Sequence, residues 1–416
     1  MAQPEPERSG VVSLKLSFEV GQRIEVVVGP VAHGGHFVAR HEGQVIFVRH
    51  ALPGERVIVA VTSVAKNFAR ADVVSIIEPS SDRVITPCKY AGECGGCDFQ
   101  HVSLAAQRKL KSAVVEEQFR RIAKMDLNVE VEEVANEFDP DHVGLHWRTR
   151  VAYVADSQGR LGLRRNHSHE LVHVDKCVIA VPSIINSDML TQSWPANSTV
   201  QVVAGNGGDQ SIVVTDDSDL PQIIGRAKVR QRVLGRTFEV DANGFWQVHP
   251  GAPEALSTAV VDALSPKSGE VALDLYAGVG LFTSALLSSL KETGRVHLIE
   301  SSSTGIADAK ATFGRFPNVL FHNGQVLRVL RELAKEGLID ISVLDPPRSG
   351  AGIKVLTALA ALKPRRIAYV ACDPAALARD TAYLQDLGYL LIGLRAFDLF
   401  PMTHHVECVA TFAVGT

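Results

Sequence analysis

The stretch Glu270-Val271-Ala272-Leu273-Asp274-Leu275-Tyr276-Ala277-Gly278-Val279-Gly280 is an apolar run that leads into a glycine turn, and a helical pattern follows at 281–290. A strand, a Gly-x-Gly turn and a helix in this order are typical of ligand sites in open α/β sheets. The turn lacks the full Gly-x-Gly-x-x-Gly spacing of dinucleotide-binding folds. Because the turn alone is a weak signal, the order of the elements around it decides the fold.

From about residue 253 onward, helical and strand patterns alternate. Strands are expected at 270–275, 295–300, 319–322, 339–344, 366–371, 389–400 and 405–414. Helices are expected at 253–264, 281–290, 303–314, 326–335, 353–362 and 374–387. Seven strands ending in a β-hairpin resemble the sheet of S-adenosylmethionine-dependent methyltransferases more than a dinucleotide-binding sheet. The predicted fold class is α/β, with a Rossmann-like seven-stranded domain.

Two further segments follow strands of this predicted sheet. One reads Asp345-Pro346-Pro347-Arg348, and the other reads Val370-Ala371-Cys372-Asp373-Pro374. Ligands of open α/β sheets bind outside the carboxyl ends of the strands, where the glycine turn and both segments fall. A thiol in such a place indicates covalent catalysis beside a bound cofactor, although cysteine is also often simply buried. Cys372 is therefore a candidate nucleophile.

The composition limits the class of protein. The chain has 416 residues, which is long enough for several domains. Its apolar fraction of 46% and charged fraction of 21% are ordinary for a globular protein. No apolar run approaches the roughly 20 residues of a membrane span, and residues 1–10 do not resemble a signal or transit peptide. We expect a disordered tail at 1–13, and a cytoplasmic monomer without membrane association.

Basic residues gather in three stretches, although the formal net charge is −4. They lie at 108–124, 148–165 and 226–236. Each stretch can be a solvated face of a helix or strand, but three of them in an acidic chain indicate a surface that contacts phosphates. The pattern is compatible with a nucleic-acid partner.

Four of the six cysteines lie in the first half of the chain. Cys88, Cys94 and Cys97 form a Cys-x5-Cys-x2-Cys loop, and Cys177 is the other cysteine of that half. In a cytoplasmic protein such clustering favours a metal site over disulfides. Four thiolates suit either zinc or an iron–sulfur cluster. Three close cysteines with a distant fourth are commoner for a cluster, whereas zinc sites more often use two close pairs.

The N-terminal part alternates short β-rich runs with glycine turns, which predicts a small closed barrel of OB type. Its five strands are expected at 23–28, 34–40, 44–48, 56–61 and 69–77. Residues 103–124 show one amphipathic helical pattern, whereas 129–240 show no clear periodic plan. The expected domains are a barrel at 14–79, a central α+β domain at 80–240 whose helix packs on the catalytic domain, and the α/β domain at 241–416.

The order of these motifs resembles the RNA uracil-5 methyltransferase family, in its iron–sulfur class with an N-terminal TRAM barrel. Three more segments are similar to family motifs, so that the match spans nearly the whole chain. They are Ala51-Leu52-Pro53-Gly54-Glu55-Arg56-Val57, Phe245-Trp246-Gln247-Val248 and His404-His405-Val406-Glu407-Cys408-Val409.

The resemblance implies transfer of a methyl group from S-adenosylmethionine to carbon 5 of a uridine in RNA. It implies that Cys372 adds to carbon 6 as nucleophile and that Glu407 removes the proton from carbon 5. The N-terminus of the helix at 374–387 is expected to hold the thiol as thiolate. Without the family pattern, Glu407 would be interpreted as a surface residue, because it alternates with Val406 and Cys408 on a terminal strand.

The family motifs also imply the ligand contacts. Cofactor contacts are expected from Gln247, Tyr276, Gly278, Gly280, Leu281, Glu300, Asn323 and Asp345. A 4Fe–4S cluster is expected on Cys88, Cys94, Cys97 and Cys177. Glu300 ends the second strand, where an acidic residue can bind ribose hydroxyls. The chain departs from the family at Leu281 and His249, which stand where asparagines are usual.

Several alternatives remain open. Ribosomal RNA, 23S rRNA above all, fits the iron–sulfur class best, and transfer RNA is the second substrate. An amino methyltransferase would carry an aromatic residue in place of Arg348 and would need no thiol. A non-catalytic iron–sulfur protein that binds RNA would not need both Cys372 and Glu407.

Overall fold

The computed structural model describes residues 18–415 apart from 167, 217–219, 336 and 338. The tail expected at 1–13 lies outside the described residues. The chain divides into two compact units, Met1–Arg83 and Val84–Thr416, and the boundary expected at 240 lies inside the second unit. None of the helices in the described ranges is long and apolar enough to cross a membrane.

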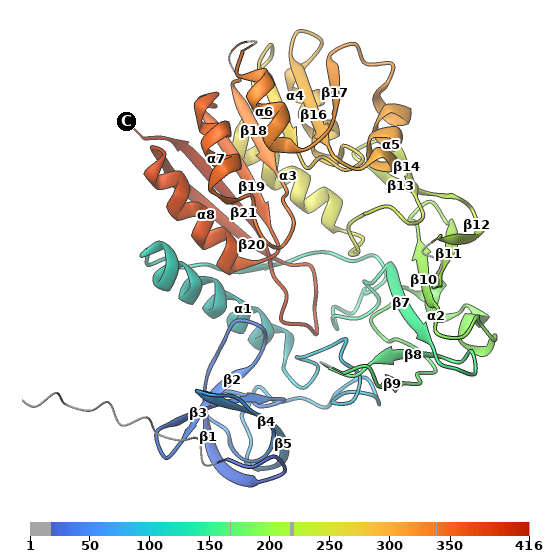
Figure 1. The fold of residues 1–416 in the computed structure, drawn as a ribbon, viewed down its shortest axis with the longest axis vertical. Coiled ribbons are helices and arrows are strands. Elements are labelled where there is room, and N and C mark those ends of the chain that lie inside the picture. The colour runs from blue at the N-terminus through green and yellow to red at the C-terminus, as the bar shows by residue number, and fades with distance from the viewer. Residues whose placement is uncertain (1–17, 167, 217–219, 336, 338, 416) are drawn as a thin grey trace, which may run out of the picture. The chain divides into compact units, whose positions relative to one another are not determined.

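The first unit contains the predicted closed barrel of five strands, in the order β1-β2-β3-β5-β4 (Figure 1). The strands are β1 (Arg23–Val31), β2 (Phe37–His41), β3 (Gln44–Arg49), β4 (Arg56–Val64) and β5 (Phe68–Glu78). Alternate side chains, such as Val57 and Val59, fill the interior. The buried carboxylate of Glu55 accepts from the Leu52 N–H at 2.8 Å and from Arg83 at 2.7 Å, which closes one end of the unit.

The second unit is built on an eight-stranded sheet of order β17-β16-β15-β18-β19-β21-β20-β6 (Figure 1). The parallel strands are β15 (Val271–Leu275), β16 (Arg295–Glu300), β17 (Val319–Asn323), β18 (Ile341–Leu344) and β19 (Arg366–Ala371). β20 (Tyr389–Asp398) and β21 (Glu407–Val414) form the predicted terminal hairpin. β6 (Val131–Glu133) adds an eighth strand beside β20. Three residues are too few to show a strand pattern, so this strand was not predicted.

Helices cover both faces of this sheet (Figure 1). One apolar core contains α3 (Ala252–Leu264), α4 (Leu281–Leu290) and α5 (Ser303–Phe313). The other contains α1 (Leu104–Gln118), α6 (Val326–Leu333), α7 (Gly352–Ala361) and α8 (Pro374–Asp386). The helix expected at 103–124 differs in its last turn, because α1 continues as a π-helical turn, η1 (Phe119–Ala123), which contacts α8. Strands covered on both faces are buried throughout.

A smaller β-structure occupies most of 150–241, where the sequence pattern was uninformative. Its six-stranded sheet has the order β12-β11-β10-β7-β8-β9. The strands are β7 (Arg150–Ala155), β8 (Leu161–Arg164), β9 (Leu171–Val172), β10 (Thr199–Ala204), β11 (Gln210–Thr215) and β12 (Gln222–Gly225). Two short helical segments, α2 (Pro182–Ile185) and η2 (Asp188–Thr191), and a hairpin of β13 (Lys228–Val233) and β14 (Arg236–Asp241) complete it. Strands this short carry little periodicity.

Several charges of the basic stretches have internal partners. Arg230 donates to Asp209 at 2.7 Å, and Lys228 pairs with Asp308 at 2.7 Å. Lys111 is buried in the second unit. The side chains of Arg230 and Lys228 remain 35% and 38% exposed, so only the buried Lys111 is excluded from the predicted phosphate-contacting surface.

Candidate active site

The carboxyl ends of the central strands meet at a cavity of about 810 Å³. Seven of the predicted site residues line it: Gln247, Tyr276, Gly278, Glu300, Asp345, Cys372 and Glu407. Five of them end or follow parallel strands, whose carboxyl ends lie at one edge of the sheet. Glu407 begins the antiparallel β21 at the same edge, and Gln247 lies in the segment before α3. The expected nucleophile, the expected base and five of the expected cofactor contacts therefore share one cavity.

The other three expected cofactor contacts do not line the cavity. Gly280 starts α4 with φ 89°, and a Cβ there would lie 2.7 Å from the Phe313 ring, so packing and backbone conformation both require glycine. Leu281 is buried in the apolar core under α4. Asn323 is exposed at the end of β17, and its carbonyl accepts from Arg328 at 3.2 Å.

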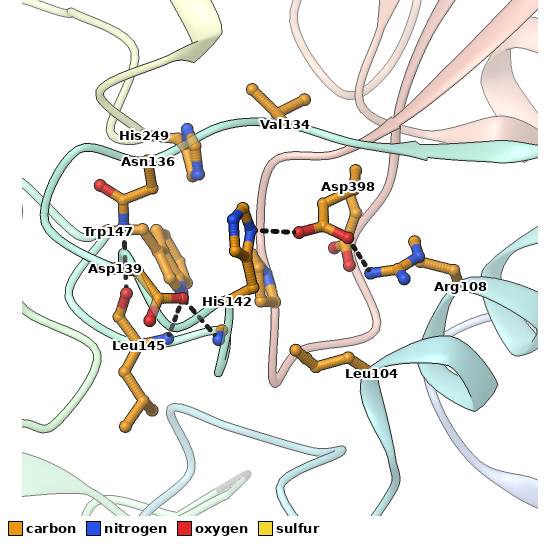
Figure 2. A pocket seen from close by; sticks show the side chains of 13 residues that line it. Leu104, Arg108, Val134, Asn136, Asp139, His142, Leu145, Trp147, His249 and Asp398 are labelled. Carbon is orange, nitrogen blue, oxygen red and sulfur yellow. Dashed lines mark hydrogen bonds and ion pairs between the residues drawn. The ribbon is translucent and has the colours of Figure 1, made fainter.

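His249 borders a different, small cavity of about 20 Å³, where it lies near Trp147 (Figure 2). The two rings stack with centroids 6.3 Å apart, and the His249 Nδ1 accepts the Gly251 N–H at 3.1 Å. Burial lowers the pKa of His249 to about 4, so the imidazole is neutral. Trp147 lines both cavities, which makes it the link between His249 and the larger one.

Glu300 lies at the end of β16 and faces the glycine turn. Its carboxylate accepts the Gly278 N–H at 2.9 Å and the Ser302 N–H at 2.6 Å. The turn begins at Tyr276, which adopts φ 60°, a conformation uncommon for residues other than glycine. These bonds hold the Glu300 carboxylate at the edge of the cavity. An acidic residue in this position can accept hydrogen bonds from ribose hydroxyls.

Acidic groups gather around Cys372. Burial, with a smaller contribution from Asp274, raises the pKa of Asp345 to about 7. Burial and the charge of Asp345 raise the pKa of Glu407 well above its ordinary value, whereas the Arg348 guanidinium lowers it. Burial and the carboxylate of Glu407 raise the pKa of the Cys372 thiol to about 11, against the lowering effect of Arg348. The thiol is therefore protonated in the free protein at neutral pH.

The expectation that a helix N-terminus holds Cys372 as thiolate is wrong for the free protein. α8 does begin just beyond the cysteine, but the Asp373 carboxylate caps it by accepting the Ala376 N–H at 2.8 Å. Burial and the Glu407 carboxylate keep the pKa of the thiol raised, at about 11.

The interpretation of Glu407 as a surface residue is also wrong. Glu407 is 4% exposed, and its neighbours Val406 and Cys408 are buried as well. Alternation along a strand separates a buried from an exposed face only where one face of the sheet meets water. Here both faces are covered, and Glu407 faces the cavity.

Arg148, Phe245 and Arg348 also line the cavity; the sequence analysis gave Arg148 a place only in a basic stretch and Phe245 only in a family motif, and it gave Arg348 no role. The signal for Arg348 was its place directly after a strand-end Asp-Pro-Pro. Ser302 and Thr304 also line the cavity, and the strand-end rule could have found them because they follow Glu300. Phe245 is 70% exposed in the loop before α3, and the strand-end rule does not reach it; its only signal was its place in the motif beside Gln247.

Cys88, Cys94, Cys97 and Cys177 line a second cavity of about 190 Å³, which shares Gly95, Gly96 and Arg148 with the first. All four cysteines are free thiols. Burial raises the pKa of Cys94, Cys97 and Cys177, and the nearby Arg148 guanidinium lowers it. Within the described part of the chain, no three His, Cys, Asp or Glu side chains are gathered as they would be around a single metal ion.

Two family models match the chain: the TRAM domain at residues 17–74 and tRNA (Uracil-5-)-methyltransferase at residues 199–413. An uncharacterized RNA methyltransferase of Streptomyces coelicolor is 45% identical, over 94% of this chain and 93% of its own length. The 23S rRNA (uracil(1939)-C(5))-methyltransferase RlmD of Shewanella sp. (strain MR-7) is 31% identical, over 99% of this chain and 98% of its own length.

A solved structure has a similar fold. The tRNA (uracil-54, C5)-methyltransferase of Pyrococcus abyssi, in complex with S-adenosyl-L-homocysteine, aligns with a TM-score of 0.71 at 21% identity, over 94% of this chain and 100% of that one. The predicted methyltransferase fold with an N-terminal TRAM barrel is thereby confirmed. The chain belongs to the tRNA (uracil-5-)-methyltransferase family and is a methyltransferase that acts on RNA.

Proposed function

We propose that this protein transfers a methyl group from S-adenosylmethionine to carbon 5 of a uridine in 23S rRNA, through a covalent bond between Cys372 and carbon 6. The observation that carries the proposal is the presence of Cys372 and Glu407 in one cavity with the glycine turn and Glu300. The choice of 23S rRNA is supported by the name of the Shewanella relative, which matches this chain over nearly its whole length.

The cavity suits S-adenosylmethionine in size and in lining. Its volume of about 810 Å³ lies within the usual range for ligand sites. A Cβ at Gly278 would meet open space, so the turn leaves room for a ligand. We assign Glu300 to the ribose hydroxyls, and Gln247, Tyr276 and Asp345 to further contacts. When bound, the cofactor supplies an electrophilic methyl group on a positively charged sulfur.

Carbon 5 of uracil is a poor nucleophile, so the ring must be activated before it is methylated. The Cys372 thiolate would add to carbon 6, which forms a carbon–sulfur bond and places an electron pair on the enolate; carbon 5 would then displace the methyl group from the cofactor's sulfur, which would leave as a neutral thioether. Glu407 removes the proton from carbon 5, the carbon–sulfur bond breaks, and its electron pair returns to sulfur. The raised pKa makes Glu407 a stronger base once it is ionised, and the Arg348 guanidinium favours the ionised form.

The substrate can be tested directly with the purified protein, methyl-labelled S-adenosylmethionine, ribosomal RNA and transfer RNA. We expect 5-methyluridine at a defined position of 23S rRNA, located by nuclease digestion and mass spectrometry. If the label appears only in transfer RNA, the substrate is transfer RNA and not 23S rRNA. Absence of 5-methyluridine from both RNAs would contradict the proposed reaction.

We also propose that Cys88, Cys94, Cys97 and Cys177 hold a 4Fe–4S cluster. Four free thiols around one cavity are a suitable donor set. Three close cysteines with a distant fourth are commoner for such a cluster than for zinc, which more often uses two close pairs. Such a cluster would stabilise the cysteine loop, and the proposed methyl transfer needs no redox step.

Protein purified without oxygen should contain about four iron and four sulfide per chain. Cys88→Ser and Cys177→Ser should lose the iron and the brown colour, whereas Cys372→Ser, which changes a thiol of the other cavity, should keep both. Metal analysis and absorption spectroscopy measure this. Stoichiometric zinc without iron in protein prepared in this way would overturn the assignment.

A further inference from the structure

The cysteine loop is bonded to the segment that leads to Glu407. Asp98 directly follows Cys97, and the N–H groups of Asp98 and Phe99 donate to the Met402 carbonyl at 3.1 and 2.9 Å. The Asp98 carboxylate contacts the His404 Nδ1 at 2.6 Å. Met402 and His404 belong to residues 399–406, the connection between β20 and β21, and Glu407 is the first residue of β21. The loop therefore holds the segment just before Glu407.

Helix α1 holds the same connection from another side. The Met402 N–H donates to the Gln107 side-chain carbonyl at 2.8 Å, and the Gln107 amide donates to the Phe99 carbonyl at 3.1 Å. The Lys111 ammonium donates to the Phe400 carbonyl at 3.0 Å. Both side chains are buried. A buried bond that loses its partner is costly, so these contacts keep the connection in one position.

A third side is closed by packing. A Cβ at Gly144 would lie 3.2 Å from side-chain atoms of both Pro401 and Met402, so these two side chains pack closely against the Gly144 backbone. The small cavity of Figure 2, beside Leu104 and Asp398, is about 20 Å³, room for about one water molecule. The connection thus has little space in which to move.

Side chains of the connection face two ways. Thr403, His405 and Glu407 line the active-site cavity. His404 lies between Thr403 and His405 in sequence, Met402 directly precedes Thr403, and both His404 and Met402 are bonded to the cysteine loop. A shift of His404 must move its neighbours toward or away from the substrate. The position of Glu407 therefore depends on contacts made outside the cavity.

We propose that Asp98 is a positioning residue for proton removal: by fixing His404 it places Glu407 where its carboxylate reaches carbon 5. This rests on the role proposed above for Glu407. Asp98 is not among the residues that line the cavity, so it acts through His404. The cysteine loop thereby contributes to the geometry of the reaction as well as to the fold.

Asp98→Ala removes the contact with His404 and keeps the main-chain bonds to Met402. Since a displacement of about 1 Å can cost on the order of 100-fold in rate, we expect kcat to fall about 10- to 100-fold. The KM for RNA should stay within about twofold, because the RNA-contacting surface is unchanged. The methylated protein–RNA adduct should accumulate during turnover, because elimination is slowed more than adduct formation. A denaturing gel with labelled cofactor measures the adduct, and iron content is determined on the same samples.

His404→Ala should behave like Asp98→Ala, and the double variant should be no worse than either. Glu93→Ala is the matched control: it removes an exposed ion pair with Arg165 beside Cys94 and should behave as wild type. Adduct in Glu407→Gln but not in Asp98→Ala would overturn the positioning role alone. No adduct in Glu407→Gln would contradict the proposed function itself. If Asp98→Ala loses iron, and if adduct formation slows as much as turnover does, the role of Asp98 is structural and the positioning role is contradicted.

Discussion

Glu407→Gln is expected to accumulate a denaturant-resistant protein–RNA species that carries the transferred methyl group, and Cys372→Ala is expected to form none. The covalent stage begins when the thiolate adds to carbon 6, and it ends only when a base removes the proton from carbon 5. Without the thiol the adduct cannot form. Without the base it forms and persists. Glutamine keeps the size of the side chain and its hydrogen bonding but cannot accept the proton.

The two variants are compared by incubation with radiolabelled cofactor and RNA, followed by a denaturing gel. Turnover of Glu407→Gln should fall by about 10²- to 10⁴-fold, the usual contribution of a general base. Cys372→Ala should bind RNA but show neither turnover nor label at the position of the adduct. If Glu407→Gln turns over at close to the wild-type rate, the base is another group. Asp345, another carboxyl group that lines the cavity, would then be tested by Asp345→Asn.

The parts of the fold with strong periodicity could be predicted from sequence. The barrel strands alternate buried and exposed residues, and the parallel strands are continuous apolar runs separated by helices. The location of the site followed from the same pattern, because parallel strands bring their carboxyl ends together. For this reason the sequence alone could place Cys372, Asp345 and Glu300 near one another.

Orientation and electrostatics could not be predicted in this way. Gly280 and Leu281 belong to the glycine turn in sequence, but their side-chain positions face the core and not the cavity. The burial of Glu407 depends on helices that cover both faces of the sheet. The pKa of Cys372 depends on acidic groups from distant segments, which a local helix-dipole argument does not include. Each of these properties is set by residues far away in the sequence.

Arg348 should control the pH at which Cys372 becomes reactive. Burial and nearby acids raise the pKa of the thiol to about 11, and Arg348 lowers it. Below this pKa the thiolate fraction rises about tenfold with each pH unit. Alkylation of Cys372 should therefore become faster from pH 7 to pH 10 in the wild type. Arg348→Met removes the opposing cation, so its thiol pKa must rise further and the whole profile must move to higher pH.

The measurement is the rate of Cys372 alkylation by iodoacetamide against pH, followed by mass spectrometry of the peptide that contains the residue. Arg348 is exposed at the cavity edge, where water screens its charge, so we expect a shift of about one pH unit. At a fixed neutral pH this corresponds to about tenfold slower alkylation. Arg348→Lys keeps the charge and should retain most of the wild-type profile. An unchanged profile in Arg348→Met would mean that this arginine does not act on the thiol, and that another cation, supplied when the ligands bind, must stabilise the thiolate.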